Sequence, residues 1–193
     1  MEKTLALKLN IIIGSTRPGR AGPKVAEWFR KFAEDHGKFE VALIDLNDFR
    51  LPVYDEPKHP RIQEYEKDHT KAWSESVASA DAYVFVTPEY NYVAPSSLIN
   101  ALDYLVREWA YKPAGIVSYG GLSGGLRAAQ SLKPLLTSLR IMPIPEGVAA
   151  PFFNKSMDEE GSFQSNDLID QSAKVMLDEL HRWAEALKVM RAA

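Results

Sequence analysis

Segments with the pattern of a β-strand alternate with segments with the pattern of an α-helix along the whole chain, and this alternation restricts the fold most strongly. A weaker strand is predicted at 141–149, where Pro143 and Pro145 favour an edge position. Short apolar runs rich in β-branched residues predict the other four strands, at residues 5–13, 41–44, 82–86 and 114–117.

Amphipathic segments separate these strands. After the first strand, apolar residues recur every three or four positions from Val25 to Ala33, and Gly37 is a typical helix end. The polar stretch 154–166 is predicted to be a loop. Similar apolar spacing predicts further helices at about 62–80, 98–106, 128–139 and 176–187.

One domain can hold all of these elements. The chain has 193 residues, and no repeat or shift in composition divides it, so residues 1–193 are predicted to form a single domain. Strands interleaved with helices form a parallel sheet covered on both faces. Ligands of such sheets bind beyond the carboxyl ends of the strands. The loops after the first, third and fourth strands are therefore the candidate site.

The composition argues against several kinds of partner. The formal net charge is −3 without a Lys/Arg block, which disfavours nucleic acid or an anionic membrane surface. The chain has no cysteine, and its histidines form no metal-binding pair. No apolar run approaches transmembrane length, and the first strand follows Met1 without a signal-peptide pattern. We therefore expect a cytoplasmic protein that binds no nucleic acid, membrane or metal.

The loop after the first strand nearly matches a triphosphate-binding P-loop, which is G-x-x-x-x-G-K followed by Ser or Thr. Its residues are Gly14-Ser15-Thr16-Arg17-Pro18-Gly19-Arg20-Ala21. Arg20 replaces the lysine, and Ala21 replaces the hydroxyl that would bind magnesium. Pro23 favours the first turn of a helix and places the helix start near Gly22. The glycine spacing also fails the dinucleotide pattern G-x-G-x-x-G.

The same loop has the groups that a single terminal phosphate requires. Ser15 and Thr16 have hydroxyls, and Arg17 and Arg20 have guanidinium groups. A helix start adds free N–H groups and a positive dipole end. A turn with solvent-exposed arginines has the same composition, so these residues alone leave both interpretations open.

The third strand leads into a loop rich in aromatic and polar side chains, Thr87-Pro88-Glu89-Tyr90-Asn91-Tyr92. Tyr90 or Tyr92 could cover a flat ring, and Asn91 or backbone groups could bond its polar rim. A simple turn with Asn91 as its Asx residue is the alternative.

The fourth strand leads into a glycine-rich loop. Its segment Gly121-Leu122-Ser123-Gly124-Gly125 matches the G-x-S-x-G pattern of hydrolases, which makes Ser123 a candidate nucleophile. The only histidine downstream is His181, on the flank of the last helix, where a triad histidine would be poorly placed. Alternatively, the glycines let backbone N–H groups approach a ligand closely. Because the three loops contain no recognisable acid–base pair, the pattern favours chemistry supplied by a cofactor.

Taken together and in this order, the loop motifs resemble those of the NADPH-dependent FMN reductase family of flavodoxin-like proteins. The resemblance covers most of the chain and implies an α/β, flavodoxin-like three-layer sandwich whose five-stranded parallel sheet has the strand order 2-1-3-4-5. Two positions depart from the family pattern: Gly22 stands where relatives often have serine or asparagine, and Ile99 where many have lysine. The motifs that carry the resemblance are residues 14–17 (GSTR), 87–91 (TPEYN), 100–104 (NALDY) and 118–125 (SYGGLSGG).

The resemblance also implies which residues bind FMN. The residues that would hold its phosphate are Ser15, Thr16, Arg17, Arg20 and the helix start at Gly22. Those that would line the isoalloxazine ring are Pro88, Glu89, Tyr90 and Asn91. Those that would contact its pyrimidine edge are Ser118, Tyr119, Gly120 and Gly121.

The implied function is transfer of hydride from NADPH or NADH to FMN and then of electrons to a quinone, azo compound, flavin or similar small acceptor. The resemblance implies a homodimer or homotetramer, with Trp109 and Tyr111 either at the interface or buried. A flavodoxin-like electron carrier or a flavin-binding regulatory module is one alternative. A serine hydrolase that uses Ser123 is the other.

Overall fold

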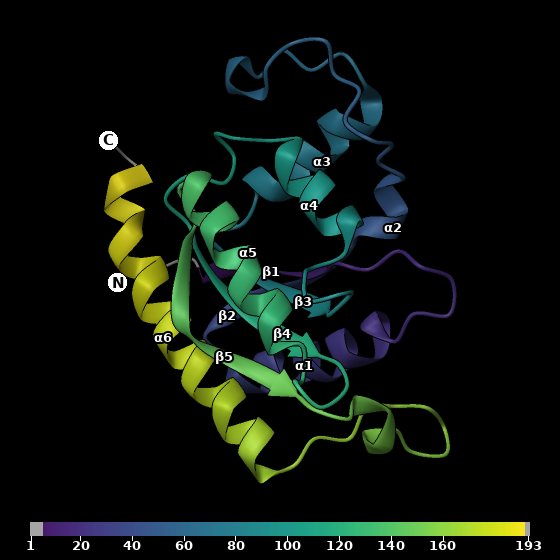
Figure 1. The fold of residues 1–193 in the computed structure, drawn as a ribbon. Coiled ribbons are helices and arrows are strands. Elements are labelled where there is room, and N and C mark those ends of the chain that lie inside the picture. The colour runs from purple at the N-terminus through teal and green to yellow at the C-terminus, as the bar shows by residue number, and fades with distance from the viewer. Residues whose placement is uncertain (1–5, 192–193) are drawn as a thin grey trace.

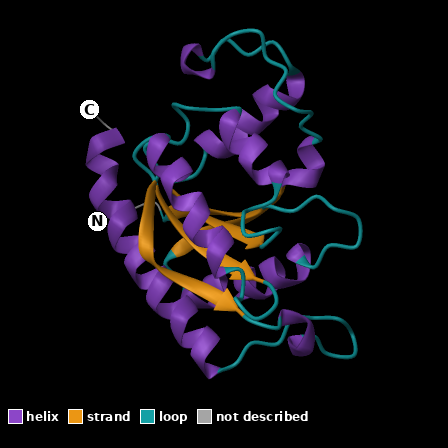
Figure 2. Cartoon of the chain, viewed as in Figure 1, coloured by secondary structure: helices purple, strands orange, loops and turns teal. Residues whose placement is uncertain are grey.

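The computed structural model describes residues 6–191, and in it five strands form a parallel sheet between two layers of helices (Figures 1 and 2). Leu5, the first residue of the predicted first strand, lies outside the described residues. The strands are β1 (Leu7–Ile13), β2 (Phe39–Asp45), β3 (Ala82–Pro88), β4 (Pro113–Tyr119) and β5 (Met142–Ala150). The helices are α1 (Gly22–His36), α2 (Leu46–Phe49), α3 (Asp68–Ala78), α4 (Ser96–Asp103), α5 (Leu126–Ser138) and α6 (Asp167–Arg191), with short 3-10 turns at Pro60–Ile62 and Phe153–Ser156.

The strand order is β2-β1-β3-β4-β5, and every pairing is parallel, which confirms the predicted flavodoxin-like topology. β3 and β4 are buried along their whole length because helices cover both faces. β5 lies at the edge, as Pro143 and Pro145 predicted, and its register with β4 shifts between Ala114 and Ile116. This order places the ends of β1, β3 and β4 next to one another.

Two apolar cores lie on the two faces of the sheet. Val25 and Phe29 of α1 and Leu180 of α6 pack on one face. Trp73 of α3 and Leu98 of α4, together with residues of α5, pack on the other. Figure 1 shows α6, in yellow, running along the whole sheet. The apolar spacing in the sequence therefore identified the buried faces correctly.

The helix predicted at 62–80 begins six residues later, at Asp68, and ends at Ala78. Pro60 opens a short 3-10 turn that Gln63 closes in a left-handed conformation, with φ of 59°. The buried Glu56 carboxylate then accepts the backbone N–H groups of Glu66 and Lys67, at 2.9 and 3.0 Å. These two bonds hold the residues just before α3 as a loop, and local sequence spacing does not reveal them.

Trp109 takes the buried one of its two predicted roles. Its side chain is completely inaccessible, and its ring packs edge-on against Trp73 and Tyr83. Tyr111 is half-buried, and its hydroxyl accepts a hydrogen bond from Arg140 at 2.9 Å. Trp109 is therefore a core residue and not an interface residue.

Candidate flavin site

The three loops predicted to form one site meet at the carboxyl edge of the sheet. The hydroxyls of Ser15, after β1, and Tyr119, at the end of β4, lie 3.4 Å apart. The Gly14 N–H donates to the carbonyl of Val86 in β3 at 2.9 Å. Ser123, after β4, donates to Glu89, after β3, at 3.0 Å. The strand order therefore joins residues that are up to 104 positions apart in the chain.

The amino end of α1 is arranged as an anion site. The helix begins at Gly22, where Pro23 predicted it, and has 15 residues. Its N-cap residue, Ala21, has no side chain that can cap the helix, and the first turn contains no acidic residue. Uncapped N–H groups at the positive end of a helix dipole stabilise a bound anion. Pro23 has no N–H, and the Lys24 N–H donates to the Ala21 carbonyl at 3.0 Å, so among the described residues the Gly22 N–H is the first-turn donor left for a ligand.

Ser15 lies under this helix start. The serine is completely buried, and a Cβ added to Gly22 would lie 2.7 Å from its Oγ and 3.0 Å from the Tyr119 hydroxyl. Glycine at position 22 therefore lets the helix approach both hydroxyls. Burial raises the pKa of Tyr119 to about 12, and the Ser15 hydrogen bond offsets only part of that increase. The Tyr119 hydroxyl thus stays protonated and able to donate.

The two arginines of this loop differ. Arg20 forms an ion pair with Asp45, at the end of β2, and both side chains are largely buried. Asp45 also accepts the Asn47 N–H at 2.9 Å and so caps α2. Arg17 is exposed and has no ion-pair partner among residues 6–191. Arg17 is therefore the guanidinium of this loop that is available to a ligand.

The loop after β3 is a tight turn attached to α5. The Tyr90 and Val93 backbones pair with each other, and Asn91 and Tyr92 have left-handed φ angles of 51° and 73°. Asn91 and Tyr92 are exposed, and the Arg127 guanidinium lies 4.0 Å from the centre of the Tyr92 ring. The turn thus presents its polar and aromatic side chains outward, at the edge of the site.

Glu89 forms a network within the protein. Its carboxylate accepts hydrogen bonds from Arg127 Nε at 2.6 Å and Ser123 Oγ at 3.0 Å. Partial burial alone would raise the pKa of Glu89, but these two donors outweigh it and hold that pKa below its usual range. Glu89 therefore stays ionised and links the loops after β3 and β4. The sequence reasoning did not identify Arg127 as its partner.

The glycine-rich loop after β4 folds back on the strand. Gly125 has φ of 79°, and a Cβ there would lie 2.8 Å from the backbone of Tyr119. The buried Ser118 hydroxyl donates to the Gly124 carbonyl at 2.9 Å. The Gly120 N–H donates to Ala150 of β5 at 3.3 Å, whereas Gly121 is exposed with open space beside its α-carbon. Gly121 is thus the backbone position of this loop that a ligand can approach.

The geometry argues against a serine hydrolase. The Ser123 hydroxyl contacts Glu89 and Arg127 and no histidine. His181 lies on α6, where its ring packs against Phe39 at 5.5 Å. His36 and His69 hydrogen-bond to Asp178 and Asp55. Among residues 6–191, no histidine therefore lies within hydrogen-bond distance of Ser123, as a Ser–His pair would require.

Comparison with known proteins agrees with this geometry. A family model described as NADPH-dependent FMN reductase matches residues 7–155, which include all three loops. The chain belongs to the NADPH-dependent FMN reductase family. An NAD(P)H-dependent FMN reductase of Schizosaccharomyces pombe is 43% identical over 148 residues, which are 75% of this chain and 74% of that protein.

Two further known proteins are similar to this FMN reductase family member. A quinone reductase of Escherichia coli is 34% identical over 175 residues, or 86% of each chain. The structure of FerB, a flavoenzyme NAD(P)H:(acceptor) oxidoreductase of Paracoccus denitrificans, superposes with a TM-score of 0.73 at 21% identity. That superposition covers 94% of this chain and 98% of FerB, and it supports the shared fold.

The residues of this FMN reductase family member are compatible with FMN. A buried serine, an uncapped helix start and the unpaired Arg17 suit one phosphate group, and a ring would lie against the turn at Tyr90. Within residues 6–191 there is no cluster of three or more His, Asp or Glu side chains arranged to hold a metal ion. Across the same range, no helix is both long and apolar enough to cross a membrane.

Proposed function

We propose that this NAD(P)H-dependent FMN and quinone reductase binds FMN across the loops after β1, β3 and β4 and reduces quinones, azo compounds, flavins or similar small acceptors. The observation that carries the proposal is the uncapped start of α1 above the buried Ser15, with Arg17 beside it. One phosphate suits that arrangement, and the loops contain no other catalytic constellation.

The phosphate side of the proposed site consists of side chains and amides from one loop. Ser15 and Thr16 would donate hydroxyl hydrogen bonds, and the Gly22 N–H at the start of α1 would face the phosphate. Arg17 would supply the positive charge. Arg20 would act indirectly, because its ion pair with Asp45 ties the loop to the end of β2.

The ring side of the proposed site is formed by the other two loops. Glu89 would position this side through Arg127 and Ser123 and would not contact the ring with its carboxylate. The residues that would line the ring and its pyrimidine edge are Pro88, Tyr90, Asn91, Ser118, Tyr119, Gly120 and Gly121.

When bound, FMN supplies the redox chemistry, accepting hydride from NAD(P)H and passing electrons to the acceptor. The role of the protein is to hold and orient FMN. The Gly121 N–H would donate to negative charge at the pyrimidine edge, since the Gly120 N–H already donates to the Ala150 carbonyl. Tyr119 stays protonated through the working pH range because burial raises its pKa to about 12. No side chain needs to act as a nucleophile.

We also propose a homodimer or homotetramer. Several large apolar side chains are exposed in the loops around the proposed site, and a second copy would cover them. They are Tyr92, Val93, Leu122, Leu126 and Phe152. The preference between NADH and NADPH, the identity of the acceptor and the cytoplasmic location stay predictions.

The purified protein tests the proposed function. FMN added to the apoprotein should bind with one equivalent per chain, and the loaded protein should oxidise NADPH or NADH when a benzoquinone is present. Failure to bind FMN would contradict both the reductase and the electron-carrier alternatives. Tight FMN binding without NAD(P)H oxidation in the presence of a quinone would instead favour the electron carrier or the regulatory module. Parallel assays with NADH and NADPH over a panel of quinones and azo compounds would define the substrates.

A further inference from the structure

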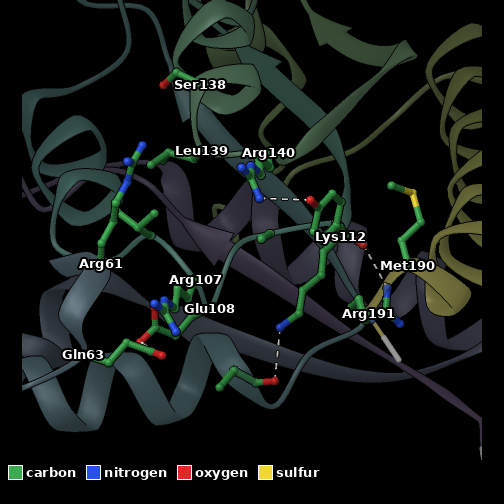
Figure 3. A pocket seen from close by; sticks show the side chains of 14 residues that line it. Arg61, Gln63, Arg107, Glu108, Lys112, Ser138, Leu139, Arg140, Met190 and Arg191 are labelled. Atoms are coloured by element: carbon green, nitrogen blue, oxygen red, sulfur yellow. Dashed lines mark hydrogen bonds between the residues drawn. The ribbon is translucent and has the colours of Figure 1, made fainter. Parts of the chain in front are cut away.

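A cavity lies at the opposite edge of the sheet from the loops after β1, β3 and β4, which are called the flavin loops below. Figure 3 shows the side chains that line it. Its volume is about 750 Å³, within the range of small-molecule sites. Lys112 in its wall directly precedes β4, and Tyr119 ends that strand, so a strand of seven residues, about 20 Å in length, separates the cavity from the flavin loops. A ligand in this cavity would therefore be distinct from FMN.

Positive side chains surround this cavity. Arg191 is paired with Asp81 at 2.8 Å. Arg61, Arg107 and Arg140 have no carboxylate partner among residues 6–191, and Arg140 bonds instead to the Tyr111 hydroxyl. The cavity thus has an excess of positive charge. The cationic residues that line it are Arg61, Arg107, Lys112, Arg140 and Arg191.

Lys112 adds a buried charge to this wall. The residue is 7% exposed, and its Nζ donates to the carbonyls of Val77 and Ala78 at 3.0 and 3.1 Å. An ammonium group has three N–H donors, so one remains beyond these two bonds. Burial, with a smaller contribution from Arg191, lowers the pKa of Lys112 to about 8. A nearby anion would satisfy the third donor and favour the charged form.

Glu108 is the carboxylate of the same cavity wall. Its Oε1 accepts hydrogen bonds from Gln63, Tyr65 and Ser74 at 3.0, 2.8 and 2.8 Å. Its Oε2 is buried and has no hydrogen-bond partner among the described residues. A buried carboxylate oxygen without a donor is costly. Because this oxygen has almost no accessible surface, a ligand in the cavity cannot reach it, and Glu108 shapes the wall without binding the ligand directly.

We propose that this cavity binds a nucleoside polyphosphate. The arginines and Lys112 match the phosphates, and the apolar side chains of the wall match a base. Phosphate groups alone would leave the apolar wall uncovered, and an uncharged nucleoside would leave the arginines unpaired. The apolar wall residues are Val106, Leu139 and Met190.

Calorimetric titration of the FMN-saturated protein tests this proposal, since FMN blocks the other phosphate site. The probes are ATP, inorganic tripolyphosphate and adenosine. We expect saturable binding of ATP, at least tenfold tighter than that of either tripolyphosphate or adenosine. Absence of ATP binding would overturn the proposal, and equal binding of tripolyphosphate would overturn the assignment to a nucleoside.

Paired variants locate the binding. Arg61→Ala/Arg107→Ala removes two exposed arginines of the cavity and should weaken ATP binding at least tenfold. Lys31→Ala/Lys71→Ala removes the same net charge from exposed positions on α1 and α3 and should change the ATP affinity less than twofold. An equal loss of ATP affinity in both double variants would show that overall charge causes the effect, and it would overturn the proposed site. Unchanged melting temperature and flavin content would show that both variants fold.

Discussion

At the scale of single residues, the proposed flavin site depends on a close approach of three groups. Ser15, Gly22 and Tyr119 come from a loop, a helix start and a strand end, and their contact leaves no room for a side chain at position 22. With glycine at position 22, we expect Ser15, Arg17 and the Gly22 N–H to bind the phosphate.

Replacement of Arg17 tests the charge on this loop. Arg17→Ala should weaken FMN binding by about 1.5–3 kcal/mol, as expected for loss of a hydrogen bond between charged groups. Flavin fluorescence quenching on titration of the apoprotein measures the affinity. Lys24→Ala, an exposed change in the first turn of α1, is the matched control and should have a small effect. Unchanged affinity in Arg17→Ala would contradict the phosphate assignment.

Replacement of Gly22 tests the close approach. Gly22→Ala should lower the free energy of unfolding by about 1–3 kcal/mol through overpacking, although alanine is the better helix former. Urea denaturation of the apoprotein measures it. Gly121→Ala is the control, because open space surrounds that position, and it should stay within about 0.5 kcal/mol of the parent. Equal stability of the two variants would show that the helix start can shift freely.

At the scale of elements, an ionic cluster attaches α6 to the end of α1. Asp178 of α6 contacts Lys38 at 2.6 Å, Lys174 at 2.7 Å and His36 at 3.1 Å. Hydrogen bonds from Lys174, Lys38 and His36 hold the pKa of Asp178 well below its usual range. Because α1 begins with the proposed phosphate site, this cluster helps to fix the helix that the site depends on.

The pH dependence of Asp178 follows from the sign of its shift. A carboxyl whose pKa is depressed in the folded state adds stability above its unfolded pKa, about 3.9, and that stability is lost as the pH falls below it. Asp178→Asn should therefore lower the free energy of unfolding by about 1 kcal/mol at pH 7, since the group is partly exposed. The difference should begin to shrink below about pH 5 and should disappear only as the pH falls through the depressed folded-state pKa of Asp178. Denaturation across that pH range measures it.

Glu40→Gln is the control for this cluster. Its partner Lys8 is 4.0 Å away, and both side chains are more than half exposed, so little stability should change at any of these pH values. A constant difference between Asp178→Asn and the parent across the pH range would mean that the ionised form contributes nothing.

At the scale of the whole molecule, ligand binding is coupled to folding. FMN that binds the native chain and not the unfolded chain should add about 2.7 kcal/mol at a concentration one hundredfold above its dissociation constant. For a chain of this length that corresponds to a rise in melting temperature of about 5–10 °C. Calorimetry with and without FMN measures it. Arg17→Ala should show a smaller rise at the same FMN concentration, and no rise in the parent protein would contradict the site.

The prediction of a homodimer or homotetramer rests on the exposed apolar side chains around the site. A dimer or tetramer would have two or four times the 21.6 kDa mass of the chain. Light scattering after gel filtration measures that mass. Tyr92→Ser/Leu122→Ser should shift the distribution toward the monomer, whereas Val53→Ser/Val189→Ser removes apolar surface elsewhere and should not. A monomer at all concentrations would overturn the proposed oligomer.

The sequence alone determined the features that depend on neighbours in the chain. Apolar spacing identified the strands and most helices, Pro23 placed the start of α1, and the prolines of β5 indicated an edge strand. Spacing failed at 62–80, where the Glu56 carboxylate accepts the N–H groups of Glu66 and Lys67 and holds the residues before α3 as a loop. Each correct prediction required only a short window of residues.

The tertiary structure decided which distant groups meet. Arg20 turned to Asp45 and left Arg17 as the free charge, Glu89 joined Arg127, and Trp109 entered the core. The basic cavity at the far edge of the sheet combines five separate segments of the chain. These pairings depend on strand order and register, which bring together residues tens of positions apart. A loop motif therefore indicates which ligand it can hold, whereas packing decides which of its side chains remain available.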